Sequence, residues 1–366
     1  MNLYIAGGCG EHGCNSFLVK GKERCILMDC GLGFEGTVSF PLLSREQAER
    51  IDCVFLTHRH MDHIAALPWL LQLGFSGKIY LSPETRPAVE QLLYGQTSPA
   101  NTSVKLIPLP YGETVPLEEG IQVRIGSSGH CSGSCWYLLK LEGKTIFFSG
   151  DYCTHSFCFP LEEPRGVRAD LAVIDCAYGD HVESAAVLFK NITDQLGKAL
   201  EEGKPVLLPA PEKGRGVDLL RLAEEAFPGV PIYLDQKTKK EAAAFSLLSN
   251  GIRALDSFEK PAGQSLLFLS DPQLKEAEGR NLAGAIQEAG GSIFFTGHVY
   301  QGSYGRQLLQ ERAAKALRYP VHQNAKEMKA MMEKNRFRIV VPFHCPEAIS
   351  SVSGVRNLKR GEHIEF

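Results

Sequence analysis

The densest group of chemically reactive side chains lies at residues 58–63, which read His-Arg-His-Met-Asp-His. This segment follows an expected strand at 53–57 and brings three imidazoles and one carboxylate within six residues. Such nitrogen and oxygen ligands suit Zn²⁺, and also Mn²⁺ or iron. In an extended backbone His58 and His60 point the same way, whereas Asp62 and His63 begin the next helix and reach a second ion. The segment therefore predicts a metal site.

Three further candidate ligands follow along the chain, each after an expected strand. They are His130, Asp151 and His344. A single polar residue at the end of a strand is more often structural than catalytic. Together with the histidine-rich segment, however, the three form an ordered series of metal ligands, which makes a solvated loop that happens to carry histidines the weaker interpretation.

Short strands are expected to position these residues. The first half of the chain is rich in apolar segments joined by glycine-rich turns, with strands expected at 3–6, 16–19, 25–29, 53–57, 78–81, 122–126, 136–141, 145–149 and 171–175. Several of them end in a polar residue. Because chemistry in α/β proteins collects where strands lead into loops, this pattern predicts a site at the strand ends.

From about residue 181 the pattern changes to alternating helices and strands. The expected helices are 184–200, 217–227, 237–248 and 274–289, and the expected strands are 206–209, 232–234, 265–270 and 292–296. This alternation is typical of a parallel α/β sheet. A last helix at 326–335 and a strand at 337–342 lead to His344.

Composition excludes several classes of protein. The 366 residues carry a net charge of −3, so a nucleic-acid-binding protein that works by a general basic excess is excluded. No run approaches the roughly 20 apolar residues of a membrane span, and the N-terminus lacks the features of a signal peptide. Eleven cysteines, without paired CxxC spacing, predict reduced thiols and a cytoplasmic location.

On these residues the sequence resembles the metallo-β-lactamase superfamily of binuclear metal hydrolases. The motifs that carry the resemblance, in the order that the family keeps, are Asp29 in Leu-Met-Asp-Cys-Gly, the cluster at 58–63, His130, Asp151 and His344. The resemblance implies an α/β fold of the metallo-β-lactamase type, an αββα sandwich. It also implies that Asp29 orients the loop that carries the first ligands.

The resemblance further implies how the ligands are grouped. One ion would be held by His58, His60 and His130, the other by Asp62, His63 and His344, with Asp151 bridging the two. Two Zn²⁺ ions are expected, with Mn²⁺ as the alternative. Two cations about 3.5–4 Å apart lower the pKa of a shared water and stabilise an attacked phosphoryl or acyl oxygen, so hydrolysis is the expected chemistry.

A narrower resemblance indicates the β-CASP subfamily, whose characterised members are predominantly nucleases of RNA or DNA. It rests on Asp175 with Ala-Tyr-Gly-Asp at 177–180, on Gly-Arg-Gly at 214–216 and on the segment 295–306. The resemblance makes His322 the second signature histidine of the subfamily. The residues around it read Pro-Val-His-Gln-Asn, where the subfamily has Ser before and Asp after the histidine.

The same resemblance implies the domain organisation. An inserted α/β β-CASP domain is expected at 181–314, between a first part of the metallo-β-lactamase core at 1–180 and a return segment at 315–366 that completes it. The insert is short for the subfamily, and no appended RNA-binding domain is expected after the core.

The expected function is a binuclear-metal-dependent phosphodiesterase, and more narrowly a ribonuclease that cleaves single-stranded RNA by metal-activated hydroxide. The expected catalytic residues are Asp62, His322 and Asp175, with His322, oriented by Asp175, protonating the leaving oxygen. The residues expected to contact substrate phosphates are Arg215, Gly302, Ser303, Gly305 and Arg306. The expected partner is RNA or single-stranded DNA and no membrane, and a homodimer is left open.

Other interpretations remain open from the sequence. A small-molecule phosphoester or ester hydrolase of the same superfamily is favoured by the modest charge and by the lack of a nucleic-acid-binding module. A non-catalytic β-CASP scaffold ranks last, because such proteins typically lose ligands and this sequence lacks none. The alternative for the His322–Asp175 pair is a buried structural hydrogen bond. The alternative for the glycines at 302–305 is an ordinary turn.

Overall fold

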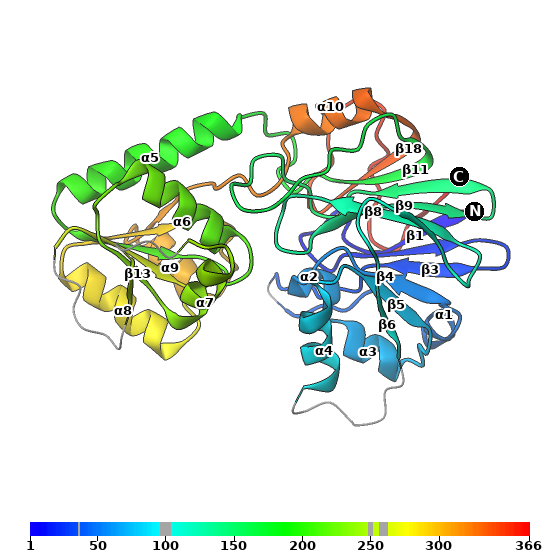
Figure 1. The fold of residues 1–366 in the computed structure, drawn as a ribbon, viewed down its shortest axis with the longest axis horizontal. Coiled ribbons are helices and arrows are strands. Elements are labelled where there is room, and N and C mark those ends of the chain that lie inside the picture. The colour runs from blue at the N-terminus through cyan, green and yellow to red at the C-terminus, as the bar shows by residue number, and fades with distance from the viewer. Residues whose placement is uncertain (36, 96–103, 248–251, 256–262) are drawn as a thin grey trace. The chain divides into compact units, whose positions relative to one another are not determined.

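The computed structural model describes residues 1–366 apart from 36, 96–103, 248–251 and 256–262. The described residues form two compact units (Figure 1). Unit 1 comprises Met1–Thr154, Phe159–Val182 and His322–Phe366, and unit 2 comprises His155–Cys158 and Glu183–Val321. The division into a core and an inserted domain, with boundaries after residues 180 and 314, stays a prediction of the sequence.

Unit 1 contains two β-sheets. Within the described residues the order of the first is β19-β1-β2-β3-β4-β5-β6, and that of the second is β18-β11-β10-β9-β8-β7. The strands of the first sheet are β1 (Asn2–Gly7), β2 (Ser16–Lys20), β3 (Cys25–Met28), β4 (Cys53–Phe55), β5 (Lys78–Leu81), β6 (Leu106–Pro108) and β19 (His363–Glu365). Those of the second are β7 (Thr114–Pro116), β8 (Gln122–Ser127), β9 (Cys135–Leu141), β10 (Lys144–Phe148), β11 (Arg168–Asp175) and β18 (Arg336–Phe343).

Helices pack on the outer face of each sheet. The first sheet shares a buried apolar cluster with α1 (Arg45–Glu49), α3 (Leu67–Gln72) and α4 (Arg86–Tyr94), and the second sheet shares one with α10 (Ala325–Lys334). Between the sheets, the rings of Phe17 in β2 and Phe343 in β18 lie 5.3 Å apart. Because both faces of the sheet are covered, the three middle residues of β2, Phe17, Leu18 and Val19, are all apolar and buried. The αββα sandwich expected from the sequence is confirmed.

Unit 2 is built on one sheet whose strand pairs are all parallel. In the described part of the unit the order is β14-β13-β15-β12-β16-β17. The strands are β12 (Pro205–Pro209), β13 (Ile232–Leu234), β14 (Ile252–Ala254), β15 (Ser265–Leu269), β16 (Ser292–Phe295) and β17 (Lys315–Ala316). The helices are α5 (Ala185–Glu201), α6 (Arg215–Ala226), α7 (Gln236–Ala244), α8 (Ala277–Glu288) and α9 (Tyr304–Gln310). The parallel α/β arrangement agrees with the expected alternation.

Differences from the expected elements have local causes. The strand expected at 53–57 ends at Phe55, because the Thr57 N–H donates to a side chain, that of Asp29. The helix expected at 237–248 ends at Ala244, and its last expected residue lies outside the described residues. Short elements such as α1, β7 and β17 were not expected, since two to five residues carry too little periodicity to recognise. Among the described helices, none combines the length and apolar character that crossing a membrane requires.

A buried carboxylate attaches the segment His155–Cys158 to unit 2, although this segment lies between two strands of unit 1 in the sequence. Asp218 in α6 is 3% exposed, and its Oδ1 accepts hydrogen bonds from the Ser156 hydroxyl and from the N–H groups of Phe157 and Cys158, at 2.9–3.0 Å. Burial raises the pKa of Asp218. One side chain therefore satisfies three donors of the segment.

Asp218→Ala should lower the free energy of unfolding of unit 2 by about 1–3 kcal/mol, because it removes an acceptor that three partly buried donors share, although the Cys158 N–H keeps the Ser156 hydroxyl oxygen at 3.1 Å. Urea unfolding followed by circular dichroism measures the effect. Asp194→Ala is the matched control: this exposed carboxylate in α5 pairs with Lys190 at 2.6 Å, and its loss should cost less than about 1 kcal/mol. Equal losses in the two variants would contradict the assigned role of Asp218.

Candidate metal centre

Parallel strands bring the predicted ligands to one edge of unit 1. β3 and β4 are parallel in the first sheet, and β10, β11 and β18 are parallel in the second. Their carboxyl ends therefore meet at the same edge. The side chains at or just after these ends are Asp29, His58, Asp151, Asp175 and His344. The strand-end site expected from the sequence is thus present in the architecture.

One group of candidate ligands consists of His58, His60, His130 and Asp151, with ligand atoms within 4.8 Å of one another. His60 Nδ1 lies 3.0 Å from His58 Nε2 and 3.1 Å from His130 Nε2. Asp151 Oδ2 lies 3.6 Å from His58 Nε2 and 3.3 Å from His130 Nε2. Four ligand atoms thus converge on one point.

A second group lies beside the first and consists of Asp62, His63 and His344. Asp62 Oδ2 lies 3.2 Å from His344 Nε2 and 3.7 Å from His63 Nε2. The other oxygen of Asp151, Oδ1, lies 3.2 Å from His63 Nε2 and 3.4 Å from His344 Nδ1. Asp151 therefore presents one carboxylate oxygen to each group.

The charges of the two groups depend on one another. Burial and the neighbouring imidazoles hold the pKa of His58 well below its usual range, so this ring is neutral and offers a lone pair. Burial alone would lower the pKa of His344, but the carboxylates of Asp151 and Asp62 raise it to about 10. Protons on histidines thus compensate the negative charge of the carboxylates. A divalent cation bound at the same atoms would replace these protons and provide the compensating positive charge.

The donor set fits a divalent metal. Asp151 Oδ1 and His344 Nδ1 are buried, and neither makes a hydrogen bond within the described part of the chain. Buried polar atoms without partners are rare, and a shared cation satisfies both an acceptor oxygen and a ring nitrogen. Imidazole nitrogens and carboxylate oxygens are the ligands that such cations take in proteins.

Asp29 holds the loop that carries the first ligands. Its Oδ1 accepts from the Thr57 N–H at 2.8 Å, and its Oδ2 accepts from the Thr57 hydroxyl and from His63 Nδ1, both at 2.8 Å. Since Nδ1 of His63 then carries the proton, Nε2 is the atom left for a metal. The Thr57 hydroxyl also lies 3.0 Å from His58 Nδ1, so the same contact orients a second ring. One buried carboxylate thereby positions two candidate ligands.

Asn15 was not assigned a role from the sequence. Its Nδ2 lies 2.8 Å from His63 Nε2 and 3.4 Å from Asp62 Oδ2. The Gly31 N–H donates to the Asn15 carbonyl. A Cβ on Gly31 would lie 1.6 Å from the Asp62 carbonyl oxygen, so only glycine allows the main chain at residue 31 to lie this close to Asp62. The available signal was a glycine-rich turn that ends in Asn at the start of a buried strand, which by itself does not specify a site.

The structure brings His322 and Asp175 together beside both groups. His322 Nδ1 lies 2.8 Å from Asp175 Oδ2, and its ring centre lies 4.8 Å from that of His130 and 5.1 Å from that of His344. Asp175 Oδ2 also accepts from the Tyr152 N–H at 2.9 Å. The carboxylate is therefore fixed from two sides.

The residues expected to contact phosphate belong to unit 2. They are Arg215, Gly302, Ser303, Gly305 and Arg306. Ser303 begins α9, where its hydroxyl oxygen accepts from the Arg306 N–H at 3.1 Å. The Gly305 N–H donates to the Gln273 carbonyl at 3.1 Å. Their role in binding substrate stays a prediction of the sequence.

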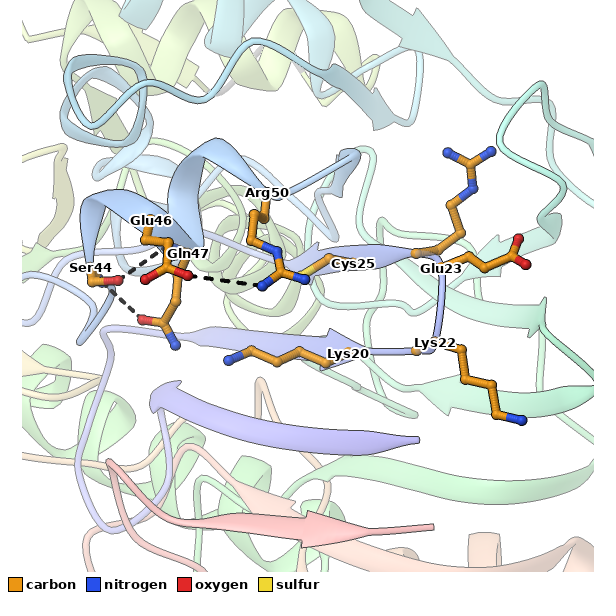
Figure 2. A pocket seen from close by; sticks show the side chains of 10 residues that line it. Lys20, Lys22, Glu23, Cys25, Ser44, Glu46, Gln47 and Arg50 are labelled. Carbon is orange, nitrogen blue, oxygen red and sulfur yellow. Dashed lines mark hydrogen bonds and ion pairs between the residues drawn. The ribbon is translucent and has the colours of Figure 1, made fainter.

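A separate pocket of unit 1 lies at the turn between β2 and β3 (Figure 2). It has a volume of about 460 Å³ and is lined by both bases and acids, among them Lys20, Lys22, Glu46 and Arg50. Arg50 lies 3.9 Å from Glu46, and burial raises the pKa of the Cys25 thiol to about 11. The pocket lies at the opposite end of β3 from Asp29.

Comparisons with known proteins show which proteins this chain resembles. Residues 24–202 match the family described as beta-lactamase superfamily domain. Endoribonuclease ysh1 of Emericella nidulans is 24% identical over 85% of this chain and 43% of its own length. Cleavage and polyadenylation specificity factor 73 of Drosophila melanogaster is 23% identical over 67% of this chain and 39% of its own. Transcription termination factor FttA of Methanosarcina mazei is 26% identical over 70% and 45%.

A solved structure shares the fold along nearly the whole chain. The crystal structure of a protein of unknown function from Enterococcus faecalis V583 matches with a TM-score of 0.66 and 14% identity, over 99% of both chains. The family match and the fold confirm the resemblance to the metallo-β-lactamase superfamily. The curated relatives likewise support the narrower resemblance to the β-CASP subfamily seen in the sequence. The chain spans less than half the length of these curated relatives.

Asp29→Asn should weaken divalent metal binding by about 10–100-fold, because the loss of a partner that orients a ligand has effects of this size. Competition with a chromogenic chelator measures the dissociation constant. Asp52→Asn is the matched control, since Asp52 also accepts a main-chain hydrogen bond, from Cys25 at 2.7 Å, but at the far end of β3. An unchanged affinity in Asp29→Asn would show that the carboxylate does not orient a ligand.

Proposed function

We propose that the protein is a binuclear-metal-dependent phosphodiesterase that cleaves single-stranded RNA. The observation that carries the proposal is Asp151, which presents one oxygen to each of two ligand groups. The relatives named endoribonuclease support RNA as the substrate. Their names describe those proteins, and the assignment to this chain is our inference.

The proposed ligands divide into two sets around Asp151. One ion would be held by His58, His60 and His130, and the other by Asp62, His63 and His344. Zinc is the proposed metal, because tetrahedral and expanded sites of imidazole and carboxylate suit it. When bound, a pair of such cations acidifies water and neutralises the charge that develops on a phosphoryl group.

His322 is the proposed general acid. A carboxylate only accepts hydrogen bonds, so Asp175 fixes the proton of His322 on Nδ1 and leaves Nε2 to exchange a proton with the substrate. Asp175 also stabilises the imidazolium that holds the proton before transfer to the leaving oxygen. Asp62, whose side chain is 21% exposed, is the proposed catalytic carboxylate within reach of water.

Substrate phosphates are proposed to contact unit 2. Arg215 at the start of α6 and Arg306 in α9 supply guanidinium groups, which bind phosphate oxygens in pairs. The turn at Gly302 supplies a backbone N–H group. The N–H groups of Ser303 and Gly305, which the sequence also predicts as phosphate contacts, already donate to the carbonyls of Tyr300 and Gln273, so Arg215, Gly302 and Arg306 remain the proposed contacts.

A small-molecule phosphoester hydrolase is the second candidate, and the net charge of −3 favours it. The assays described below distinguish the two, because such an enzyme would cleave a small diester and leave RNA intact. A cytoplasmic location stays a prediction of the sequence, and a homodimer stays open.

The purified protein should contain close to two zinc ions per chain, because the two ligand groups are complete. Elemental analysis measures the content, and a chelator should lower the melting temperature. His60→Ala should reduce the metal content and abolish activity. His363→Ala, in the exposed strand β19, serves as the control. Protein without metal, whose melting temperature does not respond to added Zn²⁺ or Mn²⁺, would contradict the binuclear assignment.

His322→Ala should lower turnover of RNA by about 10²–10⁴-fold while the metal content stays unchanged. A p-nitrophenyl phosphodiester, whose leaving group needs no proton, should largely rescue His322→Ala but not His60→Ala. Asp175→Asn should have a smaller effect than His322→Ala, since it spares the proton donor. Steady-state kinetics on both substrates measures these effects.

Three other outcomes would change the assignment. Equal loss on both substrates, with metal retained, would give His322 a role in positioning and not in proton transfer. Loss of metal in His322→Ala would make His322 a ligand. Cleavage of the small diester by the wild-type protein, without cleavage of RNA, would favour the second candidate.

A further inference from the structure

Gln323 follows the proposed general acid directly, in a stretch that departs from the subfamily pattern of Ser before and Asp after the histidine. Gln323 is 1% exposed. Its Nε2 donates to the main-chain carbonyl of Asp175 at 2.7 Å, and its N–H donates to the carbonyl of Tyr152 at 2.7 Å. Both hydrogen bonds are buried and connect segments far apart in the sequence.

These contacts close a ring of hydrogen bonds around Asp175. His322 Nδ1 binds Asp175 Oδ2 at 2.8 Å, and the Tyr152 N–H donates to the same oxygen at 2.9 Å. The Tyr152 carbonyl accepts from Gln323, whose side chain returns to Asp175. The consecutive residues His322 and Gln323 therefore hold Asp175 at two points, one on the carboxylate and one on the main chain.

We propose that Gln323 is a positioning residue that holds the His322 imidazole on Asp175, which rests on the proposed role of His322 as general acid. The N–H and the side-chain Nε2 of Gln323 both donate hydrogen bonds that fix the main chain next to His322. The imidazole of His322 is therefore attached to a backbone that is held in place. A general acid has to lie within hydrogen-bonding distance of the leaving oxygen, and small displacements of catalytic groups reduce rates strongly.

The chemistry of the side chain supports this role over simple filling of space. A carboxylate at this position would present only acceptors towards the Asp175 carbonyl and could not bond to it. Gln323 Oε1 is buried without a hydrogen bond within the described part of the chain. The amide thus forms the bond to Asp175 although its own oxygen stays unsatisfied.

The second departure from the pattern, Asn324, has a separate local role. Its side chain accepts from the Glu327 N–H at 3.0 Å, and the Glu327 side chain accepts from the Asn324 N–H at 2.9 Å, which forms a capping box at the start of α10. The helix therefore begins at Ala325, two residues after Gln323. Gln323 thus bonds to Asp175, and Asn324 caps the helix that follows. Together these two residues hold the main chain that carries His322.

The test uses proton NMR of the full-length, metal-loaded protein, which reports the hydrogen bond whether or not the protein is a nuclease. A ring N–H bonded to a carboxylate gives a far-downfield resonance. The signal of His322 is assigned by its loss in His322→Ala, and that of His63, bonded to Asp29, serves as an internal reference. Gln323→Met should abolish or shift the His322 signal and leave the His63 signal in place.

Two further variants complete this experiment. Gln122→Met, at an exposed position in β8, is the matched control and should change neither signal. Gln323→Glu keeps the shape and removes the donor to Asp175, so it should affect the His322 signal as Gln323→Met does, and it replaces that variant if Gln323→Met does not fold. An unchanged His322 signal in a folded Gln323 variant would overturn the proposal.

Kinetics tests whether Gln323 acts through His322. Gln323→Met should lower kcat on RNA by about 10²-fold with little change in KM, and should spare the p-nitrophenyl diester. Added to His322→Ala, it should have no further effect, because the group that it positions is gone. A further 10²-fold loss in the double variant would overturn the proposal. An inactive wild-type protein whose His322 signal still depends on Gln323 would refute the proposed function and leave this inference standing.

Discussion

The site depends on the burial of Asp151 between two groups of imidazoles. This carboxylate is 2% exposed, and a charge removed from water is costly unless opposite charge compensates it. Burial alone would raise its pKa, but His63, His344 and His130 hold it well below the usual range. A pair of divalent cations would provide the same compensation at the same atoms. The arrangement of the surrounding residues follows from this requirement.

The fold meets the requirement by ending its strands at one edge. Each sheet of unit 1 contributes parallel strands, and their carboxyl ends carry Asp29, Asp151 and Asp175. Hydrogen bonds then orient the rings: Asp29 holds His63, and Asp175 holds His322. In both pairs a buried carboxylate binds Nδ1 and leaves Nε2 for chemistry. The same arrangement, a buried carboxylate bound to Nδ1 of a histidine, thus orients both the proposed ligand His63 and the proposed general acid His322.

Much of this site could be predicted from the sequence, because ligands in close sequence spacing and strands of ordinary length both leave a clear signal. The cluster at 58–63 and the strand before it are examples. The roles of Asn15 and Gln323 could not be predicted, since a single amide acquires its role only from the carbonyl or ring that the fold places beside it. The same reason applies to Asp218, whose three partners lie about 60 residues away in the sequence.

The central claim is that the two groups of ligands support cleavage of a phosphodiester in RNA. The most direct measurement incubates the zinc-loaded protein with end-labelled single-stranded RNA and DNA of the same sequence, each with a 5′-monophosphate or a 5′-hydroxyl, and resolves the products on a gel. The account predicts that RNA is cleaved, that a chelator stops the reaction and that restored Zn²⁺ restarts it. Intact RNA in the presence of folded protein with two bound zinc ions would contradict it.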